Sequence, residues 1–212
     1  MRYNYIAIEG NIGAGKTSLA TRIAQRYNGK LILEQFEENP FLVKFYQDPE
    51  KYAFPLELSF LADRYQQLMR ELPNQELFSD FTISDYFLNK SLIFARKTLN
   101  DDEYQLFITL FNIMNANLPR PDLLVHLYVN TNRLQQNIRS RGRDYEQQIP
   151  DGYLEKIQES YLNYLKQQPQ LRVLLLDMNN VDFVAYPSHL EQVLAIIDRD
   201  HPKGLTGIKL DV

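Results

Sequence analysis

Residues 10–17, near the N-terminus, have the order Gly-Asn-Ile-Gly-Ala-Gly-Lys-Thr, which matches the pattern G-x-x-x-x-G-K-[ST] in full. In this pattern the glycines let backbone N–H groups face an anion, the lysine contacts the outer phosphates of a nucleoside triphosphate, and the threonine hydroxyl can ligate magnesium. The segment predicts a phosphate loop, although a glycine-rich turn without a ligand is the alternative and the phosphoryl acceptor stays open. The predicted nucleotide-binding residues of the loop are Gly10, Asn11, Ile12, Gly13, Ala14, Gly15, Lys16, Thr17 and Ser18.

Two carboxylates come directly after short apolar runs, where strands of a parallel sheet are expected to end. Glu34 follows residues 31–33, and Asp85 follows residues 81–84. Ligands bind beyond the carboxyl ends of such strands, so both side chains are expected at the ligand-binding edge. Asp85 is predicted to bind magnesium together with Thr17, and Glu34 to orient the hydroxyl that accepts the phosphoryl group. For each carboxylate the alternative is an ordinary helix cap or turn residue.

Three arginines, Arg139, Arg141 and Arg143, stand within five residues at the end of a predicted helix. Like charges at this density repel one another unless an anion lies among them, and the forked guanidinium group suits phosphate oxygens. The cluster predicts a mobile lid over about residues 139–150 that closes on a triphosphate, with Gly142 as its hinge. A solvated helix end is the alternative, because cations suit the helix dipole there.

The composition excludes several other classes of protein. The 212 residues, 44% hydrophobic and 24% charged, are typical of one compact domain over residues 1–212. Cysteine is absent, which excludes disulfide scaffolds, thiolate zinc sites and cysteine nucleophiles. A net charge of −4 argues against the broad basic surface of a nucleic-acid-binding protein. Without an apolar run of bilayer length or a signal-peptide pattern, a cytoplasmic location and no membrane partner are expected.

The hydrophobic period switches repeatedly between strand and helix along the chain. This alternation predicts an α/β fold in three layers, a five-stranded parallel sheet flanked by helices. Strands are predicted over 5–8, 31–33, 81–83, 123–129 and 172–176. Helices are predicted over 16–27, 40–46, 55–72, 89–99, 102–115, 131–141, 152–167 and 188–199. Residues 203–212 fit a loose tail or a short edge strand, and His126 fits a core position.

The motifs together resemble those of the deoxynucleoside kinase family, which transfers a phosphoryl group from a nucleoside triphosphate to the 5′-hydroxyl of a deoxyribonucleoside. The resemblance covers nearly the whole chain and includes Asn11, which distinguishes the family from many other proteins with such a loop. It implies the P-loop kinase fold, ATP and Mg²⁺ as cofactors, and a deoxynucleoside substrate. It also implies a homodimer, for which the apolar residues of 88–94 and 107–114 are candidates, although they fit the core equally well.

The resemblance assigns roles to individual residues. It places Glu34 where the family has a base-like glutamate, and catalysis is expected from Glu34, Lys16, Arg141 and Arg143. Beyond the phosphate loop, the phosphate donor is expected to contact Arg139, Arg141, Asp182 and Phe183. The residues expected around the deoxynucleoside are Tyr46 and Glu146 near the 3′-hydroxyl, Glu57 and Phe94 near the base, Glu34 near the acceptor hydroxyl, and Asp85. Arg64 is expected either to pair with Glu57 or to face an acceptor of a purine directly.

One position departs from the family pattern. The family's third strand normally ends in an acidic residue followed by arginine, whereas this chain has Tyr86 after Asp85. Lys90, about one helical turn further, is a candidate for the missing charge, and a solvated helix lysine is the alternative interpretation.

Glu57 also bears on the choice of base. An ionised carboxylate only accepts hydrogen bonds, so it favours a base edge that offers donors. Adenine is therefore the first choice of base and guanine the second. Together with the resemblance, this choice predicts ATP-dependent phosphorylation of a purine deoxynucleoside, with deoxyadenosine as the first candidate. The alternatives are a thymidylate-kinase-like nucleoside monophosphate kinase and a non-catalytic nucleotide-binding regulator.

Overall fold

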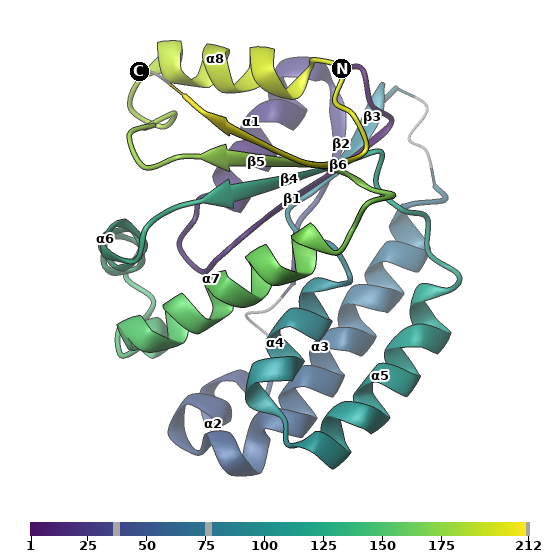
Figure 1. The fold of residues 1–212 in the computed structure, drawn as a ribbon, viewed down its shortest axis with the longest axis vertical. Helices are drawn as coiled ribbons and strands as arrows, with labels where there is room; N and C mark the ends of the chain where they lie inside the picture. The colour runs from purple at the N-terminus through teal and green to yellow at the C-terminus, as the bar shows by residue number, and fades with distance from the viewer. Residues whose placement is uncertain (36–38, 75–77, 211–212) are drawn as a thin grey trace. The chain divides into compact units, whose positions relative to one another are not determined.

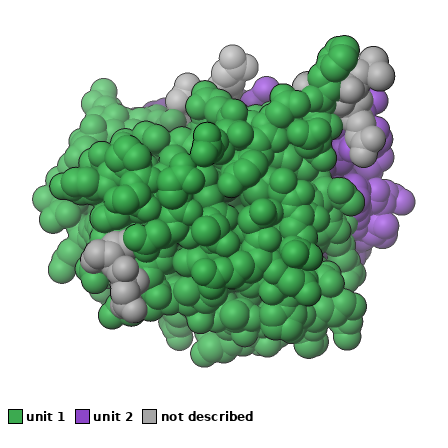
Figure 2. Space-filling model, turned by 90° about the horizontal axis from the view of Figure 1, so that it is seen from above, with its two compact units in different colours: residues 1–33, 76–86, 120–212 green, residues 34–75, 87–119 purple. Residues whose placement is uncertain are grey.

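The computed structural model of the chain describes residues 1–35, 39–74 and 78–210. Its internal contacts divide the chain into two compact units, which Figure 2 distinguishes by colour. Unit 1 comprises Met1–Leu33, Glu76–Tyr86 and Arg120–Val212, and unit 2 comprises Glu34–Gln75 and Phe87–Pro119. The expectation of a single domain over residues 1–212 stays a prediction.

Unit 1 contains a parallel sheet in the strand order β2-β3-β1-β4-β5-β6 (Figure 1). All neighbouring strands run parallel, which confirms the predicted α/β fold with a parallel sheet. The strands are β1 (Tyr5–Gly10), β2 (Gly29–Ile32), β3 (Phe81–Ser84), β4 (Leu123–Tyr128), β5 (Arg172–Asp177) and β6 (Gly204–Lys209).

Within the described residues, the sheet has six strands instead of the five predicted from the sequence. The additional strand, β6, pairs with β5 from Gly204 to Lys209. Its side chains alternate between half-buried and exposed, so it lacks the continuous apolar run that marks the inner strands. Of the two interpretations left open for the C-terminal segment, the edge strand holds as far as Lys209, while residues 211–212 lie outside the described residues.

The helices of unit 1 cover both faces of this sheet. Figure 1 shows α1 behind the strands and α7 in front of them, which gives the predicted three layers. The helices are α1 (Lys16–Tyr27), α6 (Thr131–Arg141), α7 (Asp151–Lys166) and α8 (Pro187–Ile197), with a short 3-10 helix at Asp144–Glu146. The ends of α1 and α6 coincide with those predicted.

The described part of unit 2 is helical, and its longest helix, α3, packs against the other three. The prediction that this helix begins at Pro55 is wrong, because it begins at Pro49 after Asp48, whose side chain accepts a hydrogen bond from the Lys51 N–H at 3.4 Å. Pro49 suits a first helical position because its missing N–H has no helical partner there. The helices are α2 (Leu42–Gln47), α3 (Pro49–Glu71), α4 (Lys90–Thr98) and α5 (Asp101–Asn115).

The inner strands of unit 1 form its core. Strands β1 and β4 are buried along almost all of their length, as expected for a parallel sheet covered on both faces. His126, predicted as a core residue, is fully buried in β4. Among the described helices, none combines the length and hydropathy needed to cross a bilayer.

Candidate active site

The phosphate loop between β1 and α1 requires glycine at two positions. Gly13 and Gly15 have φ angles of 80° and 88°, which residues with side chains rarely adopt. A Cβ atom on Gly13 would also lie 2.9 Å from the carbonyl oxygen of Leu134 on α6. The loop leads directly into the N-terminus of α1, whose unpaired N–H groups and dipole favour an anion.

Two asparagine side chains fix the phosphate loop. Asn11 Nδ2 donates a hydrogen bond to the carbonyl oxygen of Leu154 on α7 at 2.8 Å, and Asn137 Nδ2 donates from α6 to the carbonyl oxygen of Gly13 at 2.7 Å. Lys16 Nζ donates to the carbonyl oxygen of Asn11 at 2.9 Å. Helices α6 and α7 therefore set the position of the loop. Sequence reasoning missed Asn137, which belongs to no recognised motif.

A buried carboxylate lies directly before the loop. Glu9 is 2% exposed, and its Oε2 accepts hydrogen bonds from the Tyr161 hydroxyl on α7 at 2.8 Å and from the Gly10 N–H at 3.3 Å. The bond from Tyr161 connects the end of β1 to α7. Sequence reasoning also missed Glu9, although an acidic residue inside an apolar strand is a signal for such a role.

Asp85 lies beside the phosphate loop, directly after β3. Thr17 Oγ1 donates to Asp85 Oδ2 at 2.5 Å, and Asp85 is buried. A hydroxyl and a carboxylate are oxygen ligands of the kind that Mg²⁺ prefers, and this ion usually takes only one or two ligands from protein. Among the described residues, no group of three or more His, Cys, Asp or Glu side chains is arranged to hold a metal ion. Thr17 and Asp85 thus fit an ion whose remaining ligands are phosphate and water oxygens.

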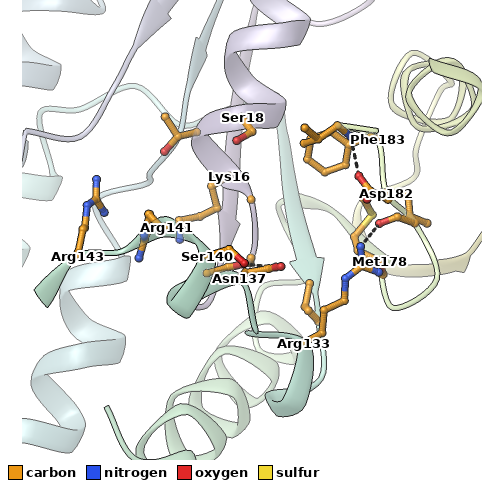
Figure 3. A pocket seen from close by; sticks show the side chains of 17 residues that line it. Lys16, Ser18, Arg133, Asn137, Ser140, Arg141, Arg143, Met178, Asp182 and Phe183 are labelled. Carbon is orange, nitrogen blue, oxygen red and sulfur yellow. Dashed lines mark hydrogen bonds between the residues drawn. The ribbon is translucent and has the colours of Figure 1, made fainter. Parts of the chain in front are cut away.

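A cavity of about 680 Å³ adjoins the phosphate loop (Figure 3). Lys16, Arg141 and Arg143 lie on one side of it, and Asp182 and Phe183 lie on the other. Of the residues predicted to bind the phosphate donor, those in the lining are Gly13, Ala14, Gly15, Lys16, Thr17, Ser18, Arg141, Asp182 and Phe183. Those outside the lining are Gly10, Asn11, Ile12 and Arg139.

Arg133, near the start of α6, fixes one wall of this cavity. Its guanidinium group donates to the carbonyl oxygens of Met178 at 2.9 Å and Val181 at 2.6 Å, and also to that of Asn179. This fork of hydrogen bonds fixes the segment after β5. Sequence reasoning did not identify Arg133, because an isolated arginine in a helix is indistinguishable from a solvated one.

The predicted donor-site residues Asp182 and Phe183 belong to the same wall. Asp182 Oδ1 accepts hydrogen bonds from the N–H groups of Val184 and Ala185, so this carboxylate stabilises its own turn. The Phe183 ring is buried and approaches the phosphate loop, since a Cβ atom on Gly15 would lie 3.3 Å from it. Phe183 therefore provides an apolar surface close to the loop.

The arginines of the predicted lid are paired with a carboxylate in this structure. Arg141 and Arg143 both form ion pairs with Glu146, which is buried. Gly142, between them, has a φ of 72° and ends α6 in the left-handed conformation that glycine favours. Arg139 is exposed, so the structure brings only two of the three arginines to the cavity.

In unit 2, Glu34 is bound on both carboxylate oxygens. Oε1 accepts hydrogen bonds from Arg64 Nε at 2.8 Å and lies 2.7 Å from Arg64 Nη2, and Oε2 lies 2.5 Å from Lys90 Nζ. Arg64 Nη1 also donates to Ser91 Oγ at 2.7 Å. All three charged side chains are nine-tenths or more buried. Lys90 is therefore a buried partner of Glu34, and the interpretation as a solvated helix lysine is wrong.

Glu57 lies on α3, seven residues before Arg64, and is 3% exposed. Its Oε1 accepts a hydrogen bond from Thr98 Oγ1 on α4 at 3.0 Å. Burial raises the pKa of Glu57 to about 7, and Arg64, Thr98 and Lys90 oppose this rise only in part. Near neutral pH both the neutral and the ionised form of Glu57 therefore have to be considered, whereas the sequence-based choice of base considers the ionised form alone.

The remaining predicted substrate residues also lie in unit 2. Phe94 is on α4 between Lys90 and Thr98, and Lys90 Nζ lies 5.7 Å from the centroid of its ring. Tyr46 is half-buried on α2, with its ring edge-on to Phe45. The cluster of Glu34, Glu57, Arg64, Lys90 and Phe94 thus joins two carboxyl groups, two cations and an aromatic ring.

Comparisons with known proteins agree with this fold. The family described as deoxynucleoside kinase matches residues 6–201. The chain is 35% identical over 195 residues to deoxyguanosine kinase of Bacillus subtilis (strain 168), which covers 90% of this chain and 94% of that protein. It is 31% identical over 191 residues to deoxyadenosine kinase of Dictyostelium discoideum, which covers 90% of this chain and 77% of that protein.

A solved structure shows the same fold. Deoxyadenosine kinase from M. mycoides, determined with the products dCMP and dCDP, superposes with a TM-score of 0.79 at 25% sequence identity, over 92% of this chain and 98% of that one. The chain therefore belongs to the deoxynucleoside kinase family. It is a phosphotransferase that uses a nucleotide as phosphate donor and a deoxynucleoside as acceptor.

Proposed function

We propose that this protein transfers the γ-phosphoryl group of ATP to the 5′-hydroxyl of a purine deoxyribonucleoside and releases the 5′-monophosphate. The observation that carries this proposal is the Glu34 carboxylate, buried and bound on each oxygen by a different cation. Such a carboxylate has one orientation, so it can accept a hydrogen bond from an incoming hydroxyl without reorganising.

Glu34 acts by aiming the nucleophile. In a loose phosphoryl transition state the acceptor oxygen forms its new bond late, so its direction matters more than early loss of its proton. The 5′-hydroxyl donates to Glu34, while Arg64 and Lys90 keep the carboxylate in place. As the P–O bond forms, the hydroxyl proton passes to the carboxylate, and the leaving group is the nucleoside diphosphate.

The phosphate donor is bound by residues of unit 1. The N–H groups of the phosphate loop and Lys16 bind its phosphates, and Arg141 and Arg143 exchange Glu146 for phosphate oxygens when the donor enters. Glu146 is thereby released for the 3′-hydroxyl of the deoxynucleoside. Thr17 and Asp85, which share a hydrogen bond, would hold Mg²⁺, and the ion would supply positive charge that offsets the charge of the donor's phosphates.

The spacing of residues along α3 supports a deoxynucleoside as the acceptor. Glu57 and Arg64, which binds Glu34, are seven residues apart on one face of α3, about 10 Å along the helix axis. A purine deoxynucleoside spans a comparable distance from its 5′-oxygen to its Watson–Crick edge. Glu57 then meets the base and Phe94 packs against it, while Tyr46 contacts the sugar.

A direct assay tests this proposal. The purified protein is incubated with Mg²⁺ and ATP, and separately with each of the deoxynucleosides and their monophosphates. Formation of monophosphate from deoxyadenosine and deoxyguanosine is expected. Turnover of monophosphates alone would instead indicate a thymidylate-kinase-like enzyme, and turnover of neither would indicate a nucleotide-binding regulator.

Glu34→Gln tests the role of the carboxylate. The amide keeps the shape but loses the charge, so we expect kcat to fall by at least about 10²-fold while ATP affinity changes little. A matched control is Glu50→Gln, an exposed glutamate in the first turn of α3, which should retain wild-type turnover. An unchanged kcat for Glu34→Gln would remove the basis of the proposed mechanism.

A further inference from the structure

Glu57 is a buried carboxyl group without a cation of its own. The two cations in its surroundings, Arg64 and Lys90, both bind Glu34. The hydrogen bond from Thr98 engages Glu57 Oε1, and no hydrogen bond to Oε2 occurs within the described ranges. Two carboxyl groups thus lie near the same two cations, and both cations form their ion pairs with Glu34. A buried carboxylate in this position gains little from ionising, since desolvation penalises its charge.

The charged surroundings of Glu57 come from three chain segments. The charged groups that act on Glu57 are Arg64 on the same helix, α3, Lys90 on α4, and Glu34 in the segment after β2. The first two favour the ionised form of Glu57 and Glu34 opposes it. Helices α2 and α5 also pack on α3, but none of their described side chains contributes to this balance. Burial raises the pKa of Glu57 to about 7 in spite of the two cations, which leaves both forms populated near neutral pH.

The two forms of a carboxyl group offer different hydrogen-bonding patterns. A carboxylate accepts on both oxygens, whereas a neutral carboxyl group accepts on one oxygen and donates from the other. The guanine Watson–Crick edge offers two adjacent donors, the N1–H and the 2-amino group. The adenine edge offers a donor, the 6-amino group, beside an acceptor, N1. The carboxylate therefore complements guanine and the neutral acid complements adenine.

We propose that Glu57 selects between the two purines by its protonation, accepting deoxyguanosine when ionised and deoxyadenosine when neutral. This inference rests on the proposed function, because it assumes that the base meets Glu57 while the 5′-hydroxyl meets Glu34. Oε1 is engaged by the Thr98 hydroxyl, whose one hydrogen is also within reach of the Phe94 carbonyl oxygen, so Oε2 is the oxygen assigned to change from acceptor to donor. The protein accepts both purines through one side chain, and the pH sets their ratio.

The test is the ratio of kcat/KM for deoxyadenosine to kcat/KM for deoxyguanosine, measured from about pH 6 to about pH 8. Both substrates use the same catalytic residues, so titrations that affect catalysis cancel in this ratio. The ratio of neutral to ionised carboxyl changes tenfold per pH unit, so we expect the selectivity ratio to fall by roughly tenfold per unit as the pH rises.

Glu57→Gln is the informative variant. Its amide offers one acceptor and one donor at every pH, as the neutral acid does, so the ratio should favour deoxyadenosine and stay constant with pH. Asp63→Asn is the matched control, because Asp63 is an exposed carboxylate on the same helix. It should keep the pH dependence of the wild type.

The outcomes separate this inference from the function on which it rests. A wild-type ratio that changes by less than about twofold over this range, or a slope that persists in Glu57→Gln, overturns the selection by Glu57. Failure to phosphorylate any deoxynucleoside overturns the proposed function instead. A wild-type ratio that does not change with pH overturns the inference by itself, so the inference remains falsifiable if the variant does not fold.

Discussion

At the scale of residues, the acceptor side depends on how one carboxylate shares two cations. Arg64 binds Glu34 Oε1 and Lys90 binds Oε2, and Ser91 fixes Arg64 in turn. The sequence has Tyr86 at the position where the resemblance to the deoxynucleoside kinases leads us to expect an arginine. Lys90 supplies a positive charge to the same carboxylate from α4, although its single ammonium group lacks the fixed fork of a guanidinium.

Lys90→Ala tests whether this charge positions Glu34. Without Lys90, Oε2 loses its partner and the carboxylate can rotate, so we expect kcat to fall by about 10²-fold with a smaller change in the KM for ATP. The measurement is steady-state kinetics with deoxyguanosine and deoxyadenosine, after circular dichroism has established that the variant folds. Lys90→Arg should restore part of the rate.

Lys97→Ala is the control for Lys90, since Lys97 is an exposed lysine on the same helix. It should leave kcat unchanged. If Lys90→Ala is folded and turns over at the wild-type rate, Lys90 does not take the place of the missing arginine.

Residue types explain which site residues the sequence could predict. The phosphate loop is visible because its chemistry requires glycines, lysine and threonine in one order. Asn137 and Arg133 act through backbone carbonyl groups of distant segments, and such contacts leave no local pattern. The ionisation of Glu57 could not be predicted either, because it depends on burial and on Glu34 taking both cations.

At the scale of elements, sequence periodicity predicts where most helices lie, and residues at the helix ends decide how closely the predicted bounds match. α1 and α6 have the predicted ends, since glycine or asparagine in the left-handed conformation follows each of them. α3 begins six residues before its predicted start, because Pro55 inside the helix was interpreted as a boundary. The sequence does not decide between a strand and a loose tail for the segment that contains β6, because half of the side chains of β6 are exposed.

The N-terminus of α5 offers a test of local stabilisation. Asn100 Oδ1 accepts from the Glu103 N–H at 3.0 Å, and Glu103 Oε2 accepts from the Asn100 N–H at 3.2 Å, which forms a capping box. Asn100→Ala should lower the free energy of unfolding by about 1 kcal/mol, and Asn100→Asp should retain most of it. Denaturant titration measures both changes. Equal stability of the two variants would show that the cap contributes nothing.

At the scale of the whole molecule, the two units carry different parts of the proposed reaction. The phosphate loop, Asp85 and the lid belong to unit 1, and Glu34, Glu57, Arg64 and Lys90 belong to unit 2. Each unit also contains a buried titratable group whose shifted pKa affects stability below neutral pH. Burial lowers the pKa of His126 in unit 1 to about 3, and burial raises that of Glu57 in unit 2 to about 7.

These two groups have opposite effects on stability. Between about pH 3 and 6.5 the unfolded chain binds a proton at His126 that the folded chain does not, so acid destabilises the fold through this residue. Between about pH 4.5 and 7 the folded chain binds a proton at Glu57 that the unfolded chain does not, so acid stabilises the fold through that residue. The two slopes oppose each other over the range they share.

Replacing His126 should therefore make the effect of Glu57 on the pH dependence of stability measurable. His126→Leu removes the loss of stability that acid causes through this histidine. The free energy of unfolding of the variant minus that of the wild type should therefore rise by about 1 kcal/mol per pH unit as the pH falls from about 6.5 to about 4.5. Glu57→Gln should change the same difference in the opposite direction. Denaturant titrations of the three proteins at a series of pH values measure these slopes. A His126→Leu difference that is constant with pH would mean that the folded protein accepts a proton at His126, contrary to its burial beside Tyr161.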